Sequence, residues 1–172
     1  GYSIADLSKE LNTSIPTITK IVGELMDEGF LVDMGTLGTN GGRRPSIYGL
    51  NPSAGYFVGT DVKKKSISIA VTNFKGQTVD YLEELPFIVQ NSEESFRELC
   101  TTIKKYLSDN GIDPSEVLAY GVNLTGRVNN ETGYCFSYFI GEDRPISAFL
   151  KEELQAEVFV ENDSRAMTYG EY

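Results

Sequence analysis

Apolar residues repeat with a helical period in two stretches near the start of the chain. In residues 3–11, "SIADLSKEL", they fall on one face of a helix that Ser3 can cap. After the break "NTS", a second helix is expected over residues 15–29, with Ser14 as its N-cap and Gly29 at its end. Asn12 tolerates the left-handed backbone that the turn between them needs. The face of the first helix comprises Ile4, Leu7, Ser8 and Leu11. The second helix is expected to bury a stripe that comprises Ile18, Ile21, Val22 and Leu25.

The residues that follow alternate as in a β-hairpin. "FLVDMG" (30–35) predicts a strand, "TLGTNGGRRP" (36–45) a turn, and "SIYGLNP" (46–52) a returning strand. Two short helices joined by about three residues and followed by a hairpin form a winged helix-turn-helix, which is a DNA-binding module. The plainer alternative is a small helical hairpin with a β-ribbon attached.

The remainder of the chain has the pattern of an α/β lobe. A Pro, Gly and Ser linker, "LNPSAGY", places a boundary near Pro52, so we expect domains at 1–52 and 53–172. Strands are expected at 57–62, 66–73 and 78–86, a helix at 92–110, and a buried strand at 117–124. A loop (125–133), an extended segment (134–140), a helix (146–154) and a strand with a polar corner and a helix start complete the pattern. The face of the long helix comprises Phe96, Leu99, Ile103 and Leu107.

Composition narrows the classes of function. The 172 residues carry a net charge of −10, are 40% hydrophobic, and contain no membrane-length apolar run. The N-terminus lacks a signal-peptide pattern, so a cytoplasmic protein without membrane contact is expected. The chain has no histidine, which excludes His-based catalysis and His metal ligation within it. Cys100 and Cys135 have no C-x-x-C spacing; a disulfide is conceivable, but buried free thiols fit better.

The few basic residues of the first domain lie at particular positions in a domain that is acidic overall. Residues 1–52 hold four basic and six acidic side chains, a net charge of −2, which leaves open that the module contacts protein instead of DNA. The cations nevertheless lie where a winged helix would meet DNA. Major-groove candidates at the start of the second helix are Ser14, Ile15, Pro16, Thr17 and Lys20. Arg43 and Arg44, in the wing, are expected on the DNA backbone or in the minor groove.

The hairpin "FVGTDVKKKS" raises the question of nucleotide binding. A strand ends at Asp61 and a tight turn follows, as in folds that hold phosphate. Such turns are usually rich in glycine, whereas this one contains Lys63, Lys64 and Lys65. Lysine can attract phosphate as a point charge, but a solvated hairpin tip is the simpler interpretation.

Three segments together resemble one family. They are "GGRRPSIYGLNPSAGYFVGTDV", "YGVNLTGRVNNETG" and "VFVENDSRAMTYGE". The last two are similar to the patterns G-x-x-x-P-G-x-V-x-x-x-T-G and V-x-x-E-N-D-x-x-A-x-x-x-G-E of the ROK family of repressors, open reading frames and kinases. The resemblance implies an α/β, multi-domain protein. A winged helix would precede the first lobe of an actin-like, ribonuclease-H-like sugar-kinase fold.

The resemblance covers only the N-terminal portion of such a protein. Family members continue into a second lobe that holds a structural zinc in a Cys and His cluster, further sugar ligands and much of the oligomer interface. We therefore expect a piece of a longer protein, with no cofactor or metal ligand in this chain. Family kinases have D-x-G-G-T where this sequence has Asp61-Val62-Lys63-Lys64-Lys65, so we expect that the turn no longer serves ATP.

The resemblance also implies sugar-binding residues. In family kinases, the aspartate matching Asp163 is the general base and the asparagine matching Asn162 binds the sugar. Ser137 lies on a segment that presents a serine to the sugar. Thr125 and Gly126 occupy the Pro-Gly loop, with threonine in place of proline. The alternative role for Asp163 is a helix N-cap. Aromatic residues that would wall a pocket or join the core are Tyr134, Phe136, Tyr138 and Phe139.

These patterns lead to two hypotheses. The first is a sugar-responsive bacterial transcriptional regulator, a repressor, that binds a double-stranded DNA operator as a homodimer or higher homo-oligomer. Its effector would be a small sugar or sugar phosphate. The second is an active, ATP-dependent ROK sugar kinase with an accessory DNA-binding domain, in which Asp163 is catalytic.

Overall fold

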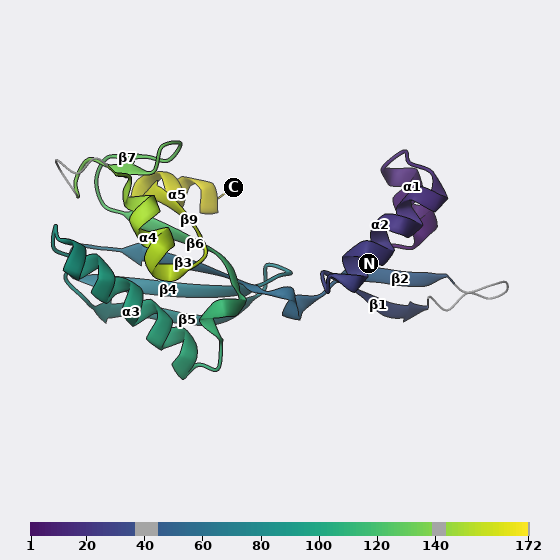
Figure 1. Cartoon of the computed structure of the whole chain (residues 1–172), viewed down its shortest axis with the longest axis horizontal. Coiled ribbons are helices and arrows are strands. Elements are labelled where there is room, and N and C mark those ends of the chain that lie inside the picture. The colour runs from purple at the N-terminus through teal and green to yellow at the C-terminus, as the bar shows by residue number, and fades with distance from the viewer. Residues whose placement is uncertain (37–44, 139–143, 172) are drawn as a thin grey trace. The chain divides into compact units, whose positions relative to one another are not determined.

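The chain forms two compact units, Gly1–Ala54 and Gly55–Tyr172 (Figure 1). The computed structural model describes residues 1–36, 45–138 and 144–171. The division falls two residues after the boundary expected from the linker at Pro52. Each unit has its own helices and its own sheet, as described below.

The first unit is a pair of helices followed by a hairpin. It contains α1 (Ile4–Glu10), α2 (Ile15–Asp27), β1 (Leu31–Thr36) and β2 (Ser46–Leu50). Ser3 and Asp6 form a reciprocal capping box at the start of α1, and Ser14 accepts from the Thr17 N–H at the start of α2. Asn12 turns the chain between the helices with a positive φ of 47°. The expected caps and helix-turn-helix are confirmed.

Main-chain hydrogen bonds tie this hairpin to the helices. β1 and β2 pair antiparallel, and Tyr2 pairs with Tyr48 through two N–H···O bonds of 2.9 Å. At the base of the hairpin, the Asn51 side chain donates to the Gly29 carbonyl at 2.8 Å, and the Asn51 N–H donates to the Phe30 carbonyl. The hairpin therefore leaves α2 in a fixed direction.

The two helical faces are less buried than their periodicity predicts. Ile18 and Val22 of α2 are buried, but Leu11 and Ile21 are 61% and 43% exposed. The prediction that Ile21 belongs to a buried stripe is wrong, and Leu11, on the face expected of the first helix, is exposed as well. Two short helices and a two-stranded hairpin contain too little chain to cover every apolar stripe.

The second unit is a five-stranded mixed sheet with helices. Its strand order is β5-β4-β3-β6-β9; β3, β4 and β5 are antiparallel neighbours, whereas β3, β6 and β9 run parallel. The elements are β3 (Tyr56–Val62), β4 (Ser66–Asn73), β5 (Thr78–Pro86), α3 (Glu93–Asp109), β6 (Val117–Leu124), β7 (Val128–Asn129), β8 (Tyr134–Cys135), α4 (Ile146–Leu154), β9 (Glu157–Asn162) and α5 (Asp163–Gly170). Short 3₁₀ turns cover Pro52–Ala54 and Pro114–Glu116.

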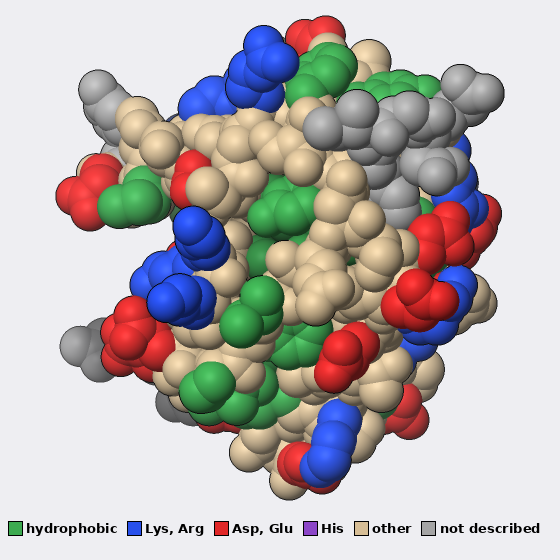
Figure 2. Space-filling view, turned by 90° about the vertical axis from the view of Figure 1, so that its left-hand side faces the viewer, with side chains coloured by type: hydrophobic (Ala, Val, Ile, Leu, Met, Phe, Trp, Pro, Cys, Tyr) green, Lys and Arg blue, Asp and Glu red, His purple; other side chains and the backbone are tan. Residues whose placement is uncertain are grey.

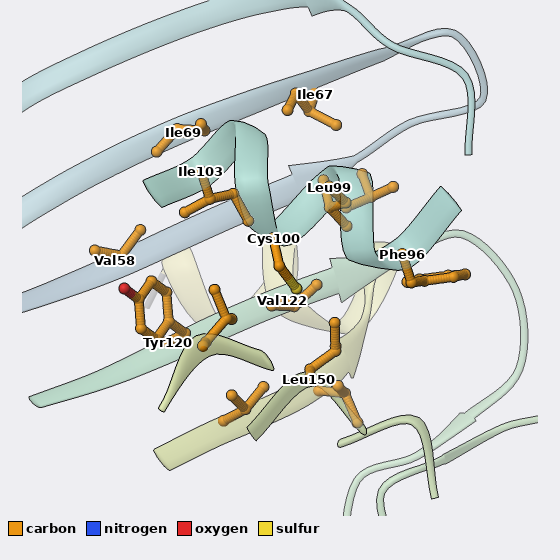
Figure 3. Packing of buried hydrophobic residues seen from close by; sticks show 14 of the residues in the cluster. Val58, Ile67, Ile69, Phe96, Leu99, Cys100, Ile103, Tyr120, Val122 and Leu150 are labelled. Atoms are coloured by element: carbon orange, nitrogen blue, oxygen red, sulfur yellow. The ribbon is translucent and has the colours of Figure 1, made fainter. Parts of the chain in front are cut away.

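The core lies between the sheet and the helices α3 and α4. Figure 3 shows side chains of α3 directed at those of β3, β4 and β6. The predicted face of α3 is confirmed, since Phe96, Leu99, Ile103 and Leu107 are all buried. Cys100 and Cys135 are buried free thiols, as expected, and burial raises the pKa of Cys100 to about 12. This packing fixes the parallel strands whose ends form the site.

The segment expected to be extended over residues 134–140 begins as a strand and then turns. Within its described residues, 134–138, the strand is limited to Tyr134–Cys135, and it pairs with β7 inside the segment expected to be a loop. Phe136 and Ser137 form a turn, and Phe139 lies outside the described residues. The apolar run is used for packing instead: Tyr138 meets Phe96 edge-on at 5.3 Å between ring centroids.

Candidate functional site

The parallel strands end together at one edge of the sheet. In register, Asp61 of β3 neighbours Asn123 of β6, and Asn123 neighbours Glu161 of β9. One residue further along, Asn162 closes β9 and α5 begins. Figure 2 views the chain from the side on which β3 ends in Figure 1, where Lys and Arg side chains gather beside hydrophobic patches. In open α/β sheets, ligands bind outside the carboxyl ends of such strands.

A pocket of 570 Å³ opens at this edge. It is lined by Gly126, Arg127, Val128, Phe136, Asn162 and Arg165. The Arg127 guanidinium lies over the Phe136 ring, 5.8 Å from its centroid. The lining therefore combines an aromatic face with amide, guanidinium and backbone groups, which suits a small polyhydroxylated ligand.

Gly126, which lines this pocket, lies against Ser137. Gly126 has a φ of +123°, and a Cβ placed on it would lie 2.0 Å from the Ser137 hydroxyl oxygen. That hydroxyl accepts a hydrogen bond from the Arg127 N–H at 3.3 Å. Glycine is thus required at position 126 for both its conformation and the close approach of the serine.

Asn162 is fully engaged in the fold. Its side-chain oxygen accepts from the Arg165 N–H at 3.2 Å and so caps α5. Its amide nitrogen donates to the Gly126 carbonyl at 2.7 Å and to the Asp163 carboxylate at 2.9 Å. The alternative that Asp163 is the N-cap is therefore wrong. Asp163 is the first helical residue, because the strand ends one position earlier.

Asp163 keeps part of its carboxylate available. Oδ1 accepts from Asn162, the Ser164 N–H and the Ser164 hydroxyl. Within the described part of the chain, no hydrogen bond reaches Oδ2. A carboxylate held through one oxygen can offer the other to a ligand hydroxyl.

The structure brings together most of the residues expected to bind a sugar. Gly126 and Asn162 line one pocket, and Ser137 and Asp163 lie against these two residues. The Thr125 hydroxyl instead donates to the Val62 carbonyl at 3.4 Å and joins the ends of β6 and β3. The sequence reasoning missed Arg127, Val128 and Arg165. A signal for Arg165 existed, since it follows Glu161 by four residues, the spacing of a helical ion pair.

Backbone hydrogen bonds within the β-sheet occupy the turn that contains Lys63, Lys64 and Lys65. The Lys63 N–H donates to the Ser66 carbonyl at 2.9 Å, and the Phe87 N–H donates to the Lys65 carbonyl. None of the three lysines has a positive φ, and the Lys63 ammonium pairs with Glu84 at 3.4 Å. The backbone is thus in an ordinary hairpin turn, without the left-handed glycine conformations that aim N–H groups at a phosphate.

Asp61 stands beside this turn in an unfavourable environment for a charge. Burial raises its pKa above the usual 3.8; the nearby Lys63 ammonium opposes that shift, and the Asp163 carboxylate adds to it. Asp61, Asn123, Ser68 and Tyr81 help to line a second pocket of 240 Å³ on the sheet. Asp61 and Asp163 therefore influence each other across the end of the sheet.

The first turn of α2 presents the expected DNA-contacting groups. Ser14, Ile15, Pro16, Thr17 and Lys20 are all exposed. The Ser14 and Thr17 hydroxyls are 2.8 Å apart, and the Lys20 ammonium lies 3.7 Å from Glu24. An exposed pair of this kind is worth little, so Lys20 remains available to a phosphate or base. Arg43 and Arg44 lie outside the described residues.

The described ranges, residues 1–36, 45–138 and 144–171, contain neither a metal-binding cluster nor a helix that could span a membrane. No group of three or more His, Cys, Asp and Glu side chains there is arranged to hold a metal ion. The zinc implied by the family therefore has no ligand set in those ranges. No helix in the same ranges is long and apolar enough to cross a membrane.

Comparison with known proteins gives one family. The profile of the ROK family matches residues 57–172. The xylose repressor of Bacillus subtilis strain 168 is 28% identical over 171 residues, which are 98% of this chain and 44% of that protein. A xylose repressor of Caldicellulosiruptor bescii is 25% identical over 167 residues, covering 96% of this chain and 42% of the repressor. The chain thus spans less than half the length of these relatives.

Solved structures agree on the fold. A ROK family transcriptional regulator, a homologue of the E. coli MLC protein, superposes over 99% of this chain and 43% of its own, with a TM-score of 0.73 and 22% identity. A ROK family glucokinase from Streptomyces griseus, solved with glucose and AMPPNP, covers 69% of this chain and 36% of its own, with a TM-score of 0.54 and 21% identity. The regulator matches both units, and the kinase matches a smaller share of the chain.

Proposed function

Because this chain belongs to the ROK family, we propose that it is the N-terminal part of a sugar-responsive transcriptional repressor that acts in the bacterial cytoplasm. Gly1–Ala54 would bind a double-stranded DNA operator, and Gly55–Tyr172 would contribute to a sugar site. The observation that supports this most is the joint presence of a helix-turn-helix with a hairpin and a polar pocket at the strand ends. The named relatives, which are xylose repressors, favour the same assignment.

The sugar would bind at the 570 Å³ pocket, and Asp163, which is hydrogen-bonded to the lining residue Asn162, would offer Oδ2 to a hydroxyl. Gly126, Ser137 and Asn162 would shape the pocket and fix its polar groups. Thr125 would contribute indirectly, because its hydroxyl joins the ends of β6 and β3. D-Xylose is the first candidate effector because of the relatives' names, followed by hexoses, N-acetylhexosamines and their 6-phosphates.

The full-length protein would act as a homodimer or higher homo-oligomer. Two winged helices would then meet two half-sites of an operator. A sugar that changes their relative placement would lower DNA affinity, because both half-sites could no longer be contacted together. A second lobe, with the zinc that the family implies, would supply the remaining sugar contacts.

Operator binding with the full-length protein tests this proposal. Selection from random-sequence DNA would define an operator, and a mobility-shift series would then be repeated with each sugar of the panel. We expect a specific complex that one sugar dissociates, and an Asp163→Asn variant whose complex resists that sugar. Failure to select any sequence would refute the DNA-binding assignment. A specific complex that every sugar leaves intact would refute the effector assignment.

The rival function is an active sugar kinase, and the presence of Asp163 favours it. The closed lysine turn in place of D-x-G-G-T argues against it, since the Lys63 N–H is already used within the hairpin. A coupled ADP-release assay over the same panel separates the two functions. We expect no sugar-dependent turnover; turnover that Asp163→Asn abolishes would replace our proposal with the kinase.

A further inference from the structure

A partly buried ion pair flanks Asn162, which lines the candidate sugar pocket, and Asp163, to which Asn162 is hydrogen-bonded. Glu161 precedes Asn162 and Asp163, and Arg165 follows them. The Arg165 guanidinium donates to the Glu161 carboxylate through Nε at 2.7 Å, with Nη2 2.6 Å from the same oxygen. The Glu161 side chain is only 17% exposed, so water screens this pair less than the surface pairs of the chain.

The pair reaches across to the loop that lines the pocket. Arg165 Nη2 also donates to the Val128 carbonyl at 2.7 Å. The second oxygen of Glu161 accepts from the Asn130 side chain at 2.9 Å, while the first also accepts from the Asn162 N–H. Glu161 and Arg165 thus link the end of β9, the first turn of α5 and the loop around β7.

Three alternate residues of this loop are attached to the same strand–helix junction. Gly126 is held by Asn162, Val128 by Arg165, and Asn130 by Glu161. The intervening Arg127 faces the other way: its N–H donates to the Ser137 hydroxyl, and its carbonyl accepts from the Phe136 N–H. An extended backbone alternates sides in this manner. Two of the three attachments depend on the Glu161–Arg165 pair.

We propose that Glu161 and Arg165 are positioning residues for the sugar site, which hold the Gly126–Asn130 loop against Asn162 and Asp163 and thereby set effector affinity. This inference rests on the proposed function for the identity of the ligand. The physical reason is that ligand groups are read only when both walls of the pocket keep their spacing, and a shift of about 1 Å has large effects on such recognition. Removing the pair leaves one of the three attachments between the loop and the strand–helix junction.

The test compares two arginines with similar surroundings. Arg165→Met removes the Glu161–Arg165 pair. Arg97→Met is the control, because it removes a pair in which Arg97 Nε donates to Glu153 at 2.9 Å and neither residue lines the pocket. Their exposures are 48% and 51%. In the full-length protein, calorimetric titration begins with D-xylose and continues through the hexoses and 6-phosphates. Operator affinity without sugar and amide hydrogen exchange are measured in parallel.

We expect Arg165→Met to weaken sugar binding by about tenfold, the loss of roughly one charge-assisted hydrogen bond. Amide exchange should quicken in residues 126–130, while operator affinity without sugar is unchanged. Arg97→Met should alter none of these, and Arg165→Lys, which keeps a cationic donor opposite Glu161, should recover most of the affinity. Wild-type affinity in Arg165→Met, unchanged exchange in its loop, or a general loss of folding that also removes operator binding would each overturn the proposal. If the wild type binds no sugar of the panel, the effector assignment fails separately. Unchanged amide exchange in residues 126–130 of Arg165→Met would still show that the Glu161–Arg165 pair does not hold the loop.

Discussion

The two carboxylate oxygens of Asp163 differ in their contacts. Oδ1 accepts hydrogen bonds from Asn162 and Ser164, whereas no hydrogen bond from the described residues reaches Oδ2. Because Oδ1 holds the start of α5, an Asp163→Asn side chain can retain that oxygen while losing the charge. We expect about a tenfold loss of effector affinity, the usual size for a hydrogen bond to a charged group, with operator affinity unchanged. Titration calorimetry and mobility shifts on the full-length protein measure the two quantities. Equal effector affinities in the two proteins would remove Asp163 from the site.

Asp61 gives a pH-dependent prediction. Its raised pKa means that the folded state binds the proton more tightly than the unfolded state, so the ionised carboxylate destabilises the fold at neutral pH. This penalty exists above the raised pKa and disappears as the pH falls below the ordinary value of 3.8. Asp61→Asn should therefore raise the melting temperature at pH 7, and the gain should vanish near pH 3.5, the acid side of the ordinary range.

Thermal melts of both proteins across this range provide the measurement. Glu83→Gln, at an exposed carboxylate of β5, is the control, and as a surface substitution it should leave the melting temperature nearly unchanged. A constant difference between Asp61→Asn and the parent at all pH values would mean that the effect arises from packing and not from the carboxylate charge.

At the scale of single residues, the sequence predicted types of side chain better than their roles. Asn162 and Asp163 are both good N-caps, and only the position at which β9 ends decides that Asn162 takes the role. The same decision leaves Asp163 partly available. The spacing of Arg165 from Glu161 indicated an ion pair, but no local pattern showed that Arg127 and Arg165 line one pocket, because the parallel pairing of β6 and β9 brings the 126–130 loop to the start of α5.

At the scale of elements, the helices and most strands follow directly from local patterns. The caps Ser3, Ser14 and Ser92 each precede a helix that the periodicity of apolar residues also predicts. The prediction for segment 134–140 fails after Cys135, where strand pairing stops and the chain turns, although Tyr138 still packs on Phe96 of the core. The prediction for Ile21 fails for another reason, since periodicity identifies a face without saying what covers it.

The N-terminus of α2 allows capping to be separated from DNA contact. Ser14 caps the helix and also lies at the face expected to meet DNA. Ser14→Asp keeps a capping oxygen but places a negative charge there, whereas Ser14→Ala removes the cap at a cost of about 1 kcal/mol. We expect Ser14→Asp to retain stability and lose operator binding strongly, and Ser14→Ala to lose stability with a smaller loss of binding. Denaturant unfolding and mobility shifts resolve the two. Strong operator binding by Ser14→Asp would place this helix end away from DNA.

At the scale of the whole molecule, DNA binding is proposed for the first unit and sugar binding for the second, and the residues for each are brought together in different ways. The pocket lies at a sheet edge that long-range pairing assembles, whereas the proposed DNA-binding face lies on one helix and one hairpin that are close in sequence. The helix and the hairpin could therefore be predicted from the sequence alone. The family resemblance was needed to propose Gly126, Ser137 and Asn162 for a sugar site, and the structure was needed to find that Arg127, Val128 and Arg165 line the pocket.

The DNA-binding energy itself should be split between Lys20 and the wing arginines. Lys20 lies on the exposed side of α2, and Glu24 beside it is the natural control. Lys20→Ala should change sequence preference by about 1–3 kcal/mol, because a major-groove contact reads particular bases. Glu24→Gln should strengthen binding to all DNA, since it removes a negative charge next to the phosphates. Replacing Arg43 and Arg44 together should weaken binding to operator and scrambled DNA alike, and reduce the salt slope by about one for each phosphate that is no longer neutralised.

Affinity for both DNAs at several salt concentrations, measured with the full-length protein, distinguishes these effects. A double arginine variant with the parent's affinity and salt slope would show that the wing does not touch the phosphates. A Lys20→Ala variant that weakens binding to operator and scrambled DNA equally would make Lys20 a phosphate-binding residue. Sequence reading by α2 would then rest on Thr17, Pro16 and Ile15, whose hydroxyl and apolar groups can meet base edges and thymine methyls.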